Sequence, residues 1–206
     1  MLKQGILFKL AETKVVAVIR GRSAVEAVEL SKAAIEAGIR AIELTYTTPE
    51  VQKVFESLKD EDVLLGAGSV LDSETARHAI LAGAKFIVSP HFNEEIARLC
   101  NRYSLPYLPG CTTISEMIKA LEGGSDIIKL FPANSFEPSF IKSVNGPLPN
   151  VRIMPTGGIN LDNLQDWLKA GAVAVGIGSD LNKAYATGGY EAAVELGRKY
   201  IQKSEW

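Results

Sequence analysis

Short runs of apolar and β-branched residues recur along the chain and predict eight β-strands. Continuous apolar runs of this length are typical of parallel strands that are covered on both faces. In the gaps between them, apolar residues recur at helical spacing, as in Ile114, Met117 and Leu121, which predicts intervening helices. The predicted strands are Val15–Ile19, Ala41–Leu44, Val63–Leu65, Phe86–Val88, Pro106–Leu108, Ile127–Leu130, Val151–Met154 and Val173–Val175.

Start and stop signals flank these predicted helices. Ser23 and Thr113 each stand three residues before a glutamate, which is the pattern of a capping box. Thr48-Pro49 predicts a helix N-cap followed by proline at the first helical position. Glycines that supply a left-handed C-terminal cap are expected where helices end and strands begin. These glycines are Gly38, Gly83, Gly124 and Gly171.

The regular alternation predicts an α/β fold, a (β/α)8 TIM barrel with an N-terminal helix at residues 1–12. Eight strand–helix units in about 200 residues are compact for that fold. An open doubly wound sheet alternates strands and helices in the same way. The barrel is favoured because the strands number eight and no Gly-x-Gly-x-x-Gly follows the first of them. No linker or low-complexity tract is visible, so we expect residues 1–206 to form a single domain.

Composition narrows the range of functions. The 206 residues include 22 Lys+Arg and 24 Asp+Glu, and positive and negative residues are mixed along the chain. This argues against a nucleic-acid partner that is bound through a strongly positive surface. No apolar run approaches the roughly 20 residues of a membrane span, so no membrane partner is expected. No signal peptide is recognisable, and Cys100 and Cys111 are too few for a disulfide framework. We therefore expect reduced thiols in a cytoplasmic protein, with no metal site.

Lys129 is the most informative polar residue. It interrupts the apolar strand Ile127–Leu130, and active sites of (β/α)8 barrels lie at the C-terminal ends of the strands. Desolvation disfavours a charged ammonium and frees the amine to act as a nucleophile. The alternative is a lysine that extends to the barrel mouth or forms a structural ion pair.

Glu43 is a second charged residue on a predicted strand. Because side chains alternate along a strand, Glu43 and Thr45 share one face, opposite Ile42 and Leu44. If the aliphatic face meets the helices, Glu43 points into the barrel, where a carboxylate can act as a general acid and base. Its alternative role is that of a buried ion-pair partner for Lys129 or Arg20, and the two roles are not exclusive.

Several residues at other strand ends are typical of ligand sites. Arg20 can bind a substrate carboxylate bidentately, and its alternative is a salt bridge at the rim. Glycines after the seventh and eighth strands occupy the position where barrels commonly hold a phosphate, although they also suit tight turns. The residues alone thus predict a phosphate-binding barrel with a desolvated lysine and a carboxylate. Lysine amines form Schiff bases with carbonyls, which favours an aldolase-type lyase over an isomerase.

As an ordered set, the strand-end motifs resemble the 2-keto-3-deoxy-6-phosphogluconate (KDPG) aldolase family, which also covers 4-hydroxy-2-oxoglutarate aldolase activity. The resemblance runs from about residue 6 to residue 200. It implies a class I aldolase on a (β/α)8 barrel, usually a homotrimer, with no metal and no other cofactor. The motifs are Val18-Ile19-Arg20, Glu43-Leu44-Thr45, Gly66-Ala67-Gly68-Ser69-Val70, Ser89-Pro90, Pro109-Gly110, Lys129-Leu130-Phe131-Pro132-Ala133 and Pro155-Thr156-Gly157-Gly158-Ile159.

The resemblance also implies roles for individual residues. Lys129 would form the Schiff base with the C2 ketone of a 2-keto acid phosphate, and Glu43 would move the protons, releasing pyruvate and glyceraldehyde 3-phosphate. Arg20 and the Ser69 region would bind the substrate carboxylate, and glycines after the last two strands would bind the phosphate. Phe131 would form part of the wall of the lysine pocket. The full set of expected substrate-binding residues is Arg20, Thr45, Gly68, Ser69, Pro90, Phe131, Gly157, Gly158, Gly178 and Ser179.

The chain departs from the family pattern at Thr47, where members often carry arginine, so Arg20 would take more of the carboxylate binding.

Gly178-Ser179-Asp180-Leu181 is similar to the related 2-keto-3-deoxy-6-phosphogalactonate aldolases, which leaves that substrate as an alternative. Two further alternatives are a barrel isomerase or decarboxylase of sugar phosphates, in which Lys129 acts only electrostatically, and a sugar-phosphate sensor without chemistry.

Overall fold

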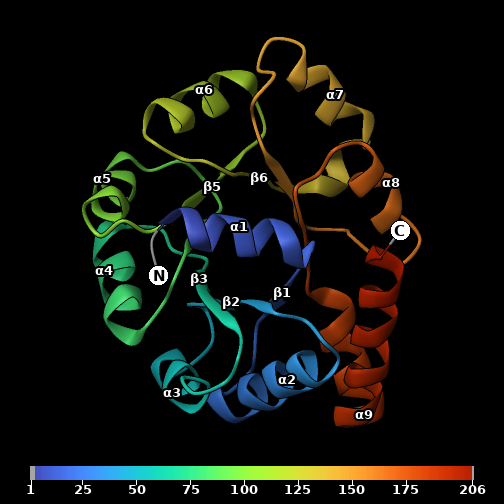
Figure 1. The fold of residues 1–206 in the computed structure, drawn as a ribbon. Coiled ribbons are helices and arrows are strands. Elements are labelled where there is room, and N and C mark those ends of the chain that lie inside the picture. Colours follow the sequence, from blue (N-terminus) through green and yellow to red (C-terminus); the bar gives the residue numbers. More distant parts are fainter. Residues whose placement is uncertain (1–2, 206) are drawn as a thin grey trace.

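The eight strands form one parallel sheet that curls into a barrel, in a computed structural model that describes residues 3–205 (Figure 1). The sheet order is β7-β6-β5-β4-β3-β2-β1-β8, and the Thr156–Gly176 bridge joins its two edges. The predicted (β/α)8 barrel is therefore confirmed. The strands are β1 (Val15–Ile19), β2 (Ala41–Thr45), β3 (Leu64–Gly68), β4 (Ile87–Ser89), β5 (Tyr107–Cys111), β6 (Ile128–Leu130), β7 (Ile153–Pro155) and β8 (Val175–Ile177).

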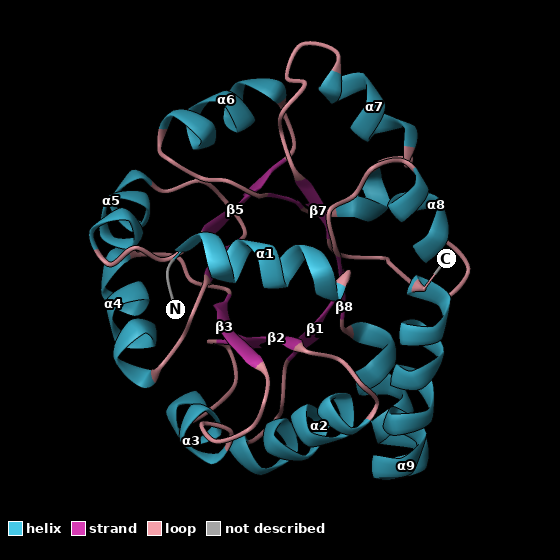
Figure 2. Ribbon diagram, in the orientation of Figure 1, coloured by secondary structure: helices cyan, strands magenta, loops and turns pink. Residues whose placement is uncertain are grey.

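Helices alternate with the strands and surround the barrel (Figure 2). Their buried faces join the outward side chains of the strands in one continuous apolar cluster. They are α2 (Ala24–Glu36), α3 (Val51–Ser57), α4 (Ser73–Ala82), α5 (Glu94–Arg102), α6 (Ile114–Glu122), the short 3-10 helix η1 (Ala133–Ser135), α7 (Ser139–Asn145), α8 (Leu164–Lys169) and α9 (Ser179–Ser204).

The N-terminal helix α1 (Lys3–Thr13) lies across one end of the barrel, as Figure 1 shows. Its buried residues Ile6, Leu7 and Leu10 pack inside the barrel with a second apolar cluster that includes Phe86. Each buried side chain of this size stabilises the fold by about 1.5–3 kcal/mol. Because α1 covers the N-terminal ends of the strands, the site must be sought at their C-terminal ends. The predicted helix is confirmed, and residues 1 and 2 lie outside the described residues.

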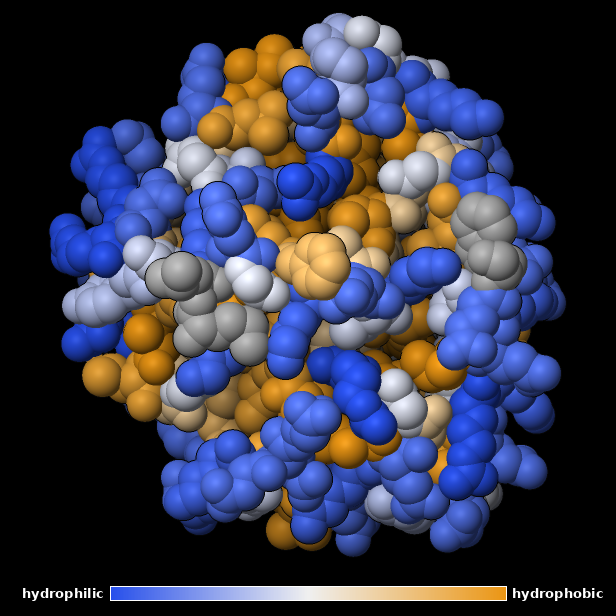
Figure 3. Space-filling view, viewed as in Figure 1, coloured by the Kyte–Doolittle hydropathy of each residue, from blue (hydrophilic) through white to orange (hydrophobic). Residues whose placement is uncertain are grey.

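Polar and charged residues cover much of the outer helices on the face crossed by α1, and apolar residues show in the recesses beside that helix (Figure 3). Within residues 3–205, none of the helices combines the length and apolarity that a membrane crossing requires. Cys100 and Cys111 are both buried free thiols.

The predicted helix caps are partly confirmed. Thr113 forms a complete capping box, and all four predicted cap glycines adopt positive φ. Ser23 caps α2, but the Glu26 carboxylate accepts from the backbone N–H of Arg22 instead of closing the box. The N-cap predicted at Thr48 is wrong, because α3 begins at Val51. The Thr48 hydroxyl instead accepts a hydrogen bond from the backbone N–H of Gly21.

Candidate active site

Lys129 and Glu43 meet inside the barrel. Lys129 is the central residue of β6, and its neighbours Ile128 and Leu130 pack outward against the helices. Its side chain therefore points inward, where Nζ donates a hydrogen bond to Oε1 of Glu43 at 3.2 Å. Lys129 is 5% exposed and Glu43 is 1% exposed. The predicted inward orientation of Glu43 is thus confirmed, and the structure brings the two residues into direct contact.

The position of Glu43 depends on a glycine. Glu43 lies on β2 beside β3, and a Cβ added to Gly68 would fall 2.2 Å from Glu43 Oε1. Only glycine leaves room for the carboxylate at that distance. Glu43 Oε2 is buried and has no hydrogen-bond partner among the described residues 3–205. A buried acceptor of this kind costs about 1–3 kcal/mol, so it marks a group that is available to a ligand or a water molecule.

A cavity of about 570 Å³ opens beside this pair at the C-terminal ends of β1, β6, β7 and β8. Phe131, which is part of its wall, has its ring centroid 5.1 Å from Lys129 Nζ. Lys129 and Glu43 are not themselves wall residues. The cavity wall contains six of the predicted site residues, namely Arg20, Phe131, Gly157, Gly158, Gly178 and Ser179.

The glycine segments give one side of this cavity the features of an anion site. Gly157 and Gly158 have φ of 93° and 79°, a left-handed conformation that brings backbone rather than side chain to the surface. Gly178 directly precedes α9, which is interrupted by a kink at Gly189, so the positive end of the first helical segment of α9 borders the cavity. Backbone N–H groups and a helix N-terminus together favour a bound phosphate or carboxylate.

Arg20 lines this cavity and Ser69 does not. Arg20 lies in the cavity wall with the glycines, whereas Thr45, Gly68, Ser69 and Pro90 are outside that wall. The Thr45 hydroxyl donates to the carbonyl of Ile19. Ser69 follows β3 with a φ of 57°, which non-glycine residues adopt uncommonly and which often marks functional sites.

Two wall residues were missed by the sequence analysis. Thr156, between β7 and the glycine pair, has a buried hydroxyl to which no group of residues 3–205 is hydrogen-bonded. Asn182, in the first turns of α9, donates from Nδ2 to the carbonyl oxygen of Arg20 at 2.6 Å. The place of Thr156 beside Gly157 could have indicated it, whereas no sequence signal distinguishes Asn182 from other polar residues on a helix.

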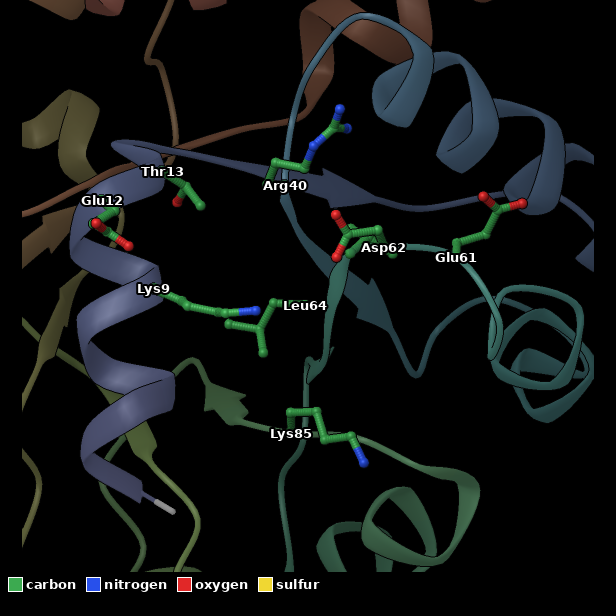
Figure 4. Close-up of a pocket in the computed structure, with 9 residues that line it drawn as sticks. Lys9, Glu12, Thr13, Arg40, Glu61, Asp62, Leu64 and Lys85 are labelled. Carbon is green, nitrogen blue, oxygen red and sulfur yellow. The ribbon is translucent and has the colours of Figure 1, made fainter. Parts of the chain in front are cut away.

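A second cavity, of about 450 Å³, lies at the opposite end of the barrel. Figure 4 shows Lys9 and Glu12 of α1 on one side of it and Arg40 and Asp62 on the other. These charged side chains are exposed, and so is Lys85 in the same wall, so the amines of Lys9 and Lys85 are solvated, unlike that of Lys129. Among residues 3–205, no three His, Cys, Asp or Glu side chains gather as metal ligands would.

Comparisons with known proteins agree with this site. Residues 6–194 match the family model described as KDPG and KHG aldolase. The chain is 34% identical over 198 residues to the 2-dehydro-3-deoxy-phosphogluconate aldolase of Treponema pallidum, covering 94% of each chain. It is also 34% identical over 173 residues to the 2-dehydro-3-deoxy-6-phosphogalactonate aldolase of Escherichia coli K12, covering 82% of this chain and 84% of that one.

A solved structure adds a chemical link. It is the KDPG aldolase of Legionella pneumophila with pyruvate captured as a covalent carbinolamine intermediate. The likeness has a TM-score of 0.83 at 30% identity and covers 94% of this chain and 96% of that one. The family predicted from the strand-end motifs is therefore confirmed: the chain belongs to the KDPG and KHG aldolase family, whose members are carbon–carbon lyases.

Proposed function

We propose that this chain is a class I aldolase that cleaves KDPG to pyruvate and glyceraldehyde 3-phosphate through a Schiff base on Lys129. The observation that carries the proposal is the buried contact of 3.2 Å between Lys129 Nζ and Glu43 Oε1. A nucleophilic amine beside an acid–base group is what carbinolamine formation and dehydration require. The carbinolamine in the Legionella relative supports the same chemistry here.

The proposed reaction uses the two residues in sequence. The Lys129 amine attacks the C2 carbonyl, and Glu43 transfers protons as the carbinolamine loses water to give a protonated imine. Glu43 then accepts the C4 hydroxyl proton, directly or through a water molecule, as the C3–C4 bond breaks. The bonding electrons enter the imine to form an enamine, and the aldehyde leaves. Protonation of the enamine at C3 and hydrolysis of the imine release pyruvate and restore the amine.

The cavity supports an assignment of the phosphate end of the substrate. Gly157, Gly158, Gly178 and Ser179 would hold the phosphate with backbone N–H groups and the N-terminus of α9. Arg20 lies in the same wall, so we assign its guanidinium to the phosphate side rather than to the carboxylate.

Three of the other predicted residues, Gly68, Ser69 and Pro90, come from strands across the barrel mouth. Gly68 is the last residue of β3, Ser69 comes directly after it, and Pro90 comes directly after β4. In the closed sheet, β3 and β4 lie across the barrel from β7 and β8. We assign the carboxylate end of the substrate to this side, with Thr45 supporting it from β2. Phe131 lies next to Lys129, in the wall of the phosphate-side cavity.

The family relationship extends the proposal in two further respects. The description of the matched family names KHG, so 4-hydroxy-2-oxoglutarate is a second proposed substrate. The relative from Escherichia coli that bears the galactonate name, together with Gly178–Leu181, makes the C4 epimer of KDPG the alternative. As in the family that the motifs resemble, we propose a cytoplasmic homotrimer that acts without a metal or another cofactor.

Steady-state kinetics test this proposal. We expect purified protein to cleave KDPG with a higher kcat/KM than its C4 epimer or 4-hydroxy-2-oxoglutarate. The Lys129→Met variant, which keeps side-chain length and loses the amine, should cleave none of them. Faster cleavage of the epimer would replace the proposed substrate, and activity of the Lys129→Met variant would remove the Schiff base from the mechanism.

A further inference from the structure

We propose that Thr48 and Asn182 are positioning residues that hold the Arg20 loop, so that the guanidinium stays on the phosphate side of the cavity. In this role they set the preference for phosphorylated over unphosphorylated substrates. The inference rests on the proposed function, because it assigns Arg20 to the phosphate.

Two side chains from different elements clamp the backbone at Arg20. The Thr48 hydroxyl accepts a hydrogen bond from the backbone N–H of Gly21 at 3.1 Å. Asn182 Nδ2 donates to the carbonyl oxygen of Arg20 at 2.6 Å. The peptide group that links Arg20 to Gly21 is therefore held at both its oxygen and its N–H. Holding both ends of one peptide group fixes the orientation of that plane.

The residue before this peptide group is fixed as well. The buried Thr45 hydroxyl donates to the carbonyl oxygen of Ile19 at 3.1 Å. Thr45 and Thr48 are themselves neighbours, with their hydroxyl oxygens 3.4 Å apart. Thr48 is only 4% exposed, so water does not readily replace its hydrogen bond.

Arg20 needs such support because nothing else fixes it. Its side chain is exposed, and no carboxylate of residues 3–205 forms a salt bridge with it. A long unpaired side chain samples many rotamers, so the direction of its Cα–Cβ bond decides which region the guanidinium reaches. Thr48 and Asn182 set that direction through the backbone, whereas a salt bridge would have set it at the guanidinium.

Asn182 also links the two parts of the anion site. It lies on α9, three residues after Ser179, where the helix N-terminus borders the cavity. Its hydrogen bond therefore ties the Arg20 loop to the helix whose positive end faces the same ligand. Removal of the Asn182 amide should therefore move the Arg20 guanidinium relative to the N-terminus of α9. The Lys129–Glu43 pair, which lies on β6 and β2, should stay in place.

Kinetics on matched substrates test the clamp. Thr48→Val keeps the shape of the side chain and leaves the Gly21 N–H without its acceptor. We expect Thr48→Val and Asn182→Ala each to raise KM for KDPG about tenfold, the scale of one well-formed hydrogen bond. For Thr48→Val, the KM for unphosphorylated 2-keto-3-deoxygluconate and the rate of pyruvate trapping should be unchanged. Thr187→Val is the control, because that exposed hydroxyl bonds only within α9.

An Arg20→Ala background separates positioning from general damage. If Thr48 acts through Arg20, Thr48→Val should add nothing to KM once the guanidinium is gone. Full additivity, or an equal rise in KM for both substrates, would overturn the inference. Asn182→Ala gives an independent answer if Thr48→Val fails to fold.

Binding of inorganic phosphate, measured by calorimetry, distinguishes failure of the clamp from failure of the proposed function. Weaker phosphate binding in both variants supports the clamp even if the wild type cleaves no aldol substrate. Unchanged phosphate binding and unchanged KM, in a wild type that cleaves KDPG, would reject the clamp and leave the aldolase proposal standing.

Discussion

Lys129 Nζ lies 3.2 Å from Glu43 Oε1, and both side chains are buried inside the barrel, while the second carboxylate oxygen of Glu43 has no hydrogen-bond partner in the described part of the chain. Breaking a buried pair by removing one member generally costs about 3–5 kcal/mol, because the other charge is left unpaired. A pair placed in this way at the barrel mouth is better explained by chemistry than by stability.

The close approach of Glu43 to Gly68 predicts that Gly68→Ala impairs catalysis. The new Cβ would fall 2.2 Å from Glu43 Oε1 and displace the carboxylate from Lys129. We expect kcat to fall about 10²-fold, the scale of a misplacement of roughly 1 Å. Gly146→Ala is the control, since its backbone φ of −57° suits alanine. Equal activity of the Gly68→Ala variant and the wild type would show that Glu43 is not held by this contact.

Replacement of Glu43 by glutamine separates proton transfer from nucleophilic attack. The amide keeps the shape of the side chain and cannot take up a proton, so kcat should fall about 10²- to 10⁴-fold. Imine formation with pyruvate should remain detectable, because the Lys129 amine is intact. A circular dichroism melt verifies folding. An unchanged kcat in a folded variant would exclude Glu43 from acid–base catalysis.

Much of the fold is encoded in local patterns, and the strand ends that form the site are the part that was hardest to predict. The apolar runs identified all eight strands. However, β3 continues through Gly66 and Gly68, which look like a turn in the sequence. Both glycines pair with β2, and their missing side chains make room for Phe86 and Glu43. A strand end that approaches a functional group closely thus loses the residues that identify a strand.

The site was predicted in part for a related reason. Lys129 and Glu43 are charged residues in apolar strands, a pattern visible in the sequence. The grouping of Arg20 with the glycines depends on the closure of the barrel between β7, β8 and β1, which no local pattern encodes. Thr48 resembled an N-cap, yet its hydroxyl bonds to Gly21, 27 residues earlier.

Stability should decline in alkaline solution. Burial raises the pKa of Cys100 and of Cys111 to about 12, from 9.0. Below about pH 9 both thiols are protonated in the folded and in the unfolded chain, so their contribution to the free energy of unfolding is fully present. Above it only the unfolded chain loses these protons, and the free energy of unfolding should fall by up to about 1.4 kcal/mol per pH unit for each thiol.

Urea denaturation at a series of pH values from about 8 to about 10.5 measures this decline. Cys111→Ala should make it shallower, because one of the two thiols is removed. Tyr107, whose pKa burial raises to about 12 from 10.0, contributes only at the upper end of the range. A free energy of unfolding that stays level over this interval would contradict the account of the buried thiols.

The Thr113 capping box should contribute measurably to stability. Its hydroxyl accepts from the Glu116 backbone N–H, and the Glu116 carboxylate accepts from the N–H groups of Thr112 and Thr113. Thr113→Ala should lower the free energy of unfolding by about 1 kcal/mol. Denaturation in urea measures this change, with Thr187→Val as the control, and equal stability of both variants would count against the cap.

The same hydrogen bonds, led by that from Thr112, lower the pKa of the Glu116 carboxyl group. The contribution of these hydrogen bonds to the free energy of unfolding is therefore present above the ordinary glutamate pKa. It is lost as the pH falls through the lowered pKa that Glu116 has in the folded chain. Glu116→Gln should weaken the fall in stability on acidification. An acid profile identical to that of the wild type would show that the carboxylate adds nothing.

Reductive trapping with pyruvate tests whether Lys129 forms a Schiff base. The protein is incubated with pyruvate and borohydride, digested, and analysed by peptide mass spectrometry. We expect a carboxyethyl adduct on Lys129, from reduction of its imine, and no adduct on the exposed Lys9 or Lys85. No adduct, or an adduct on another lysine with Lys129 unmodified, would contradict the Schiff-base mechanism.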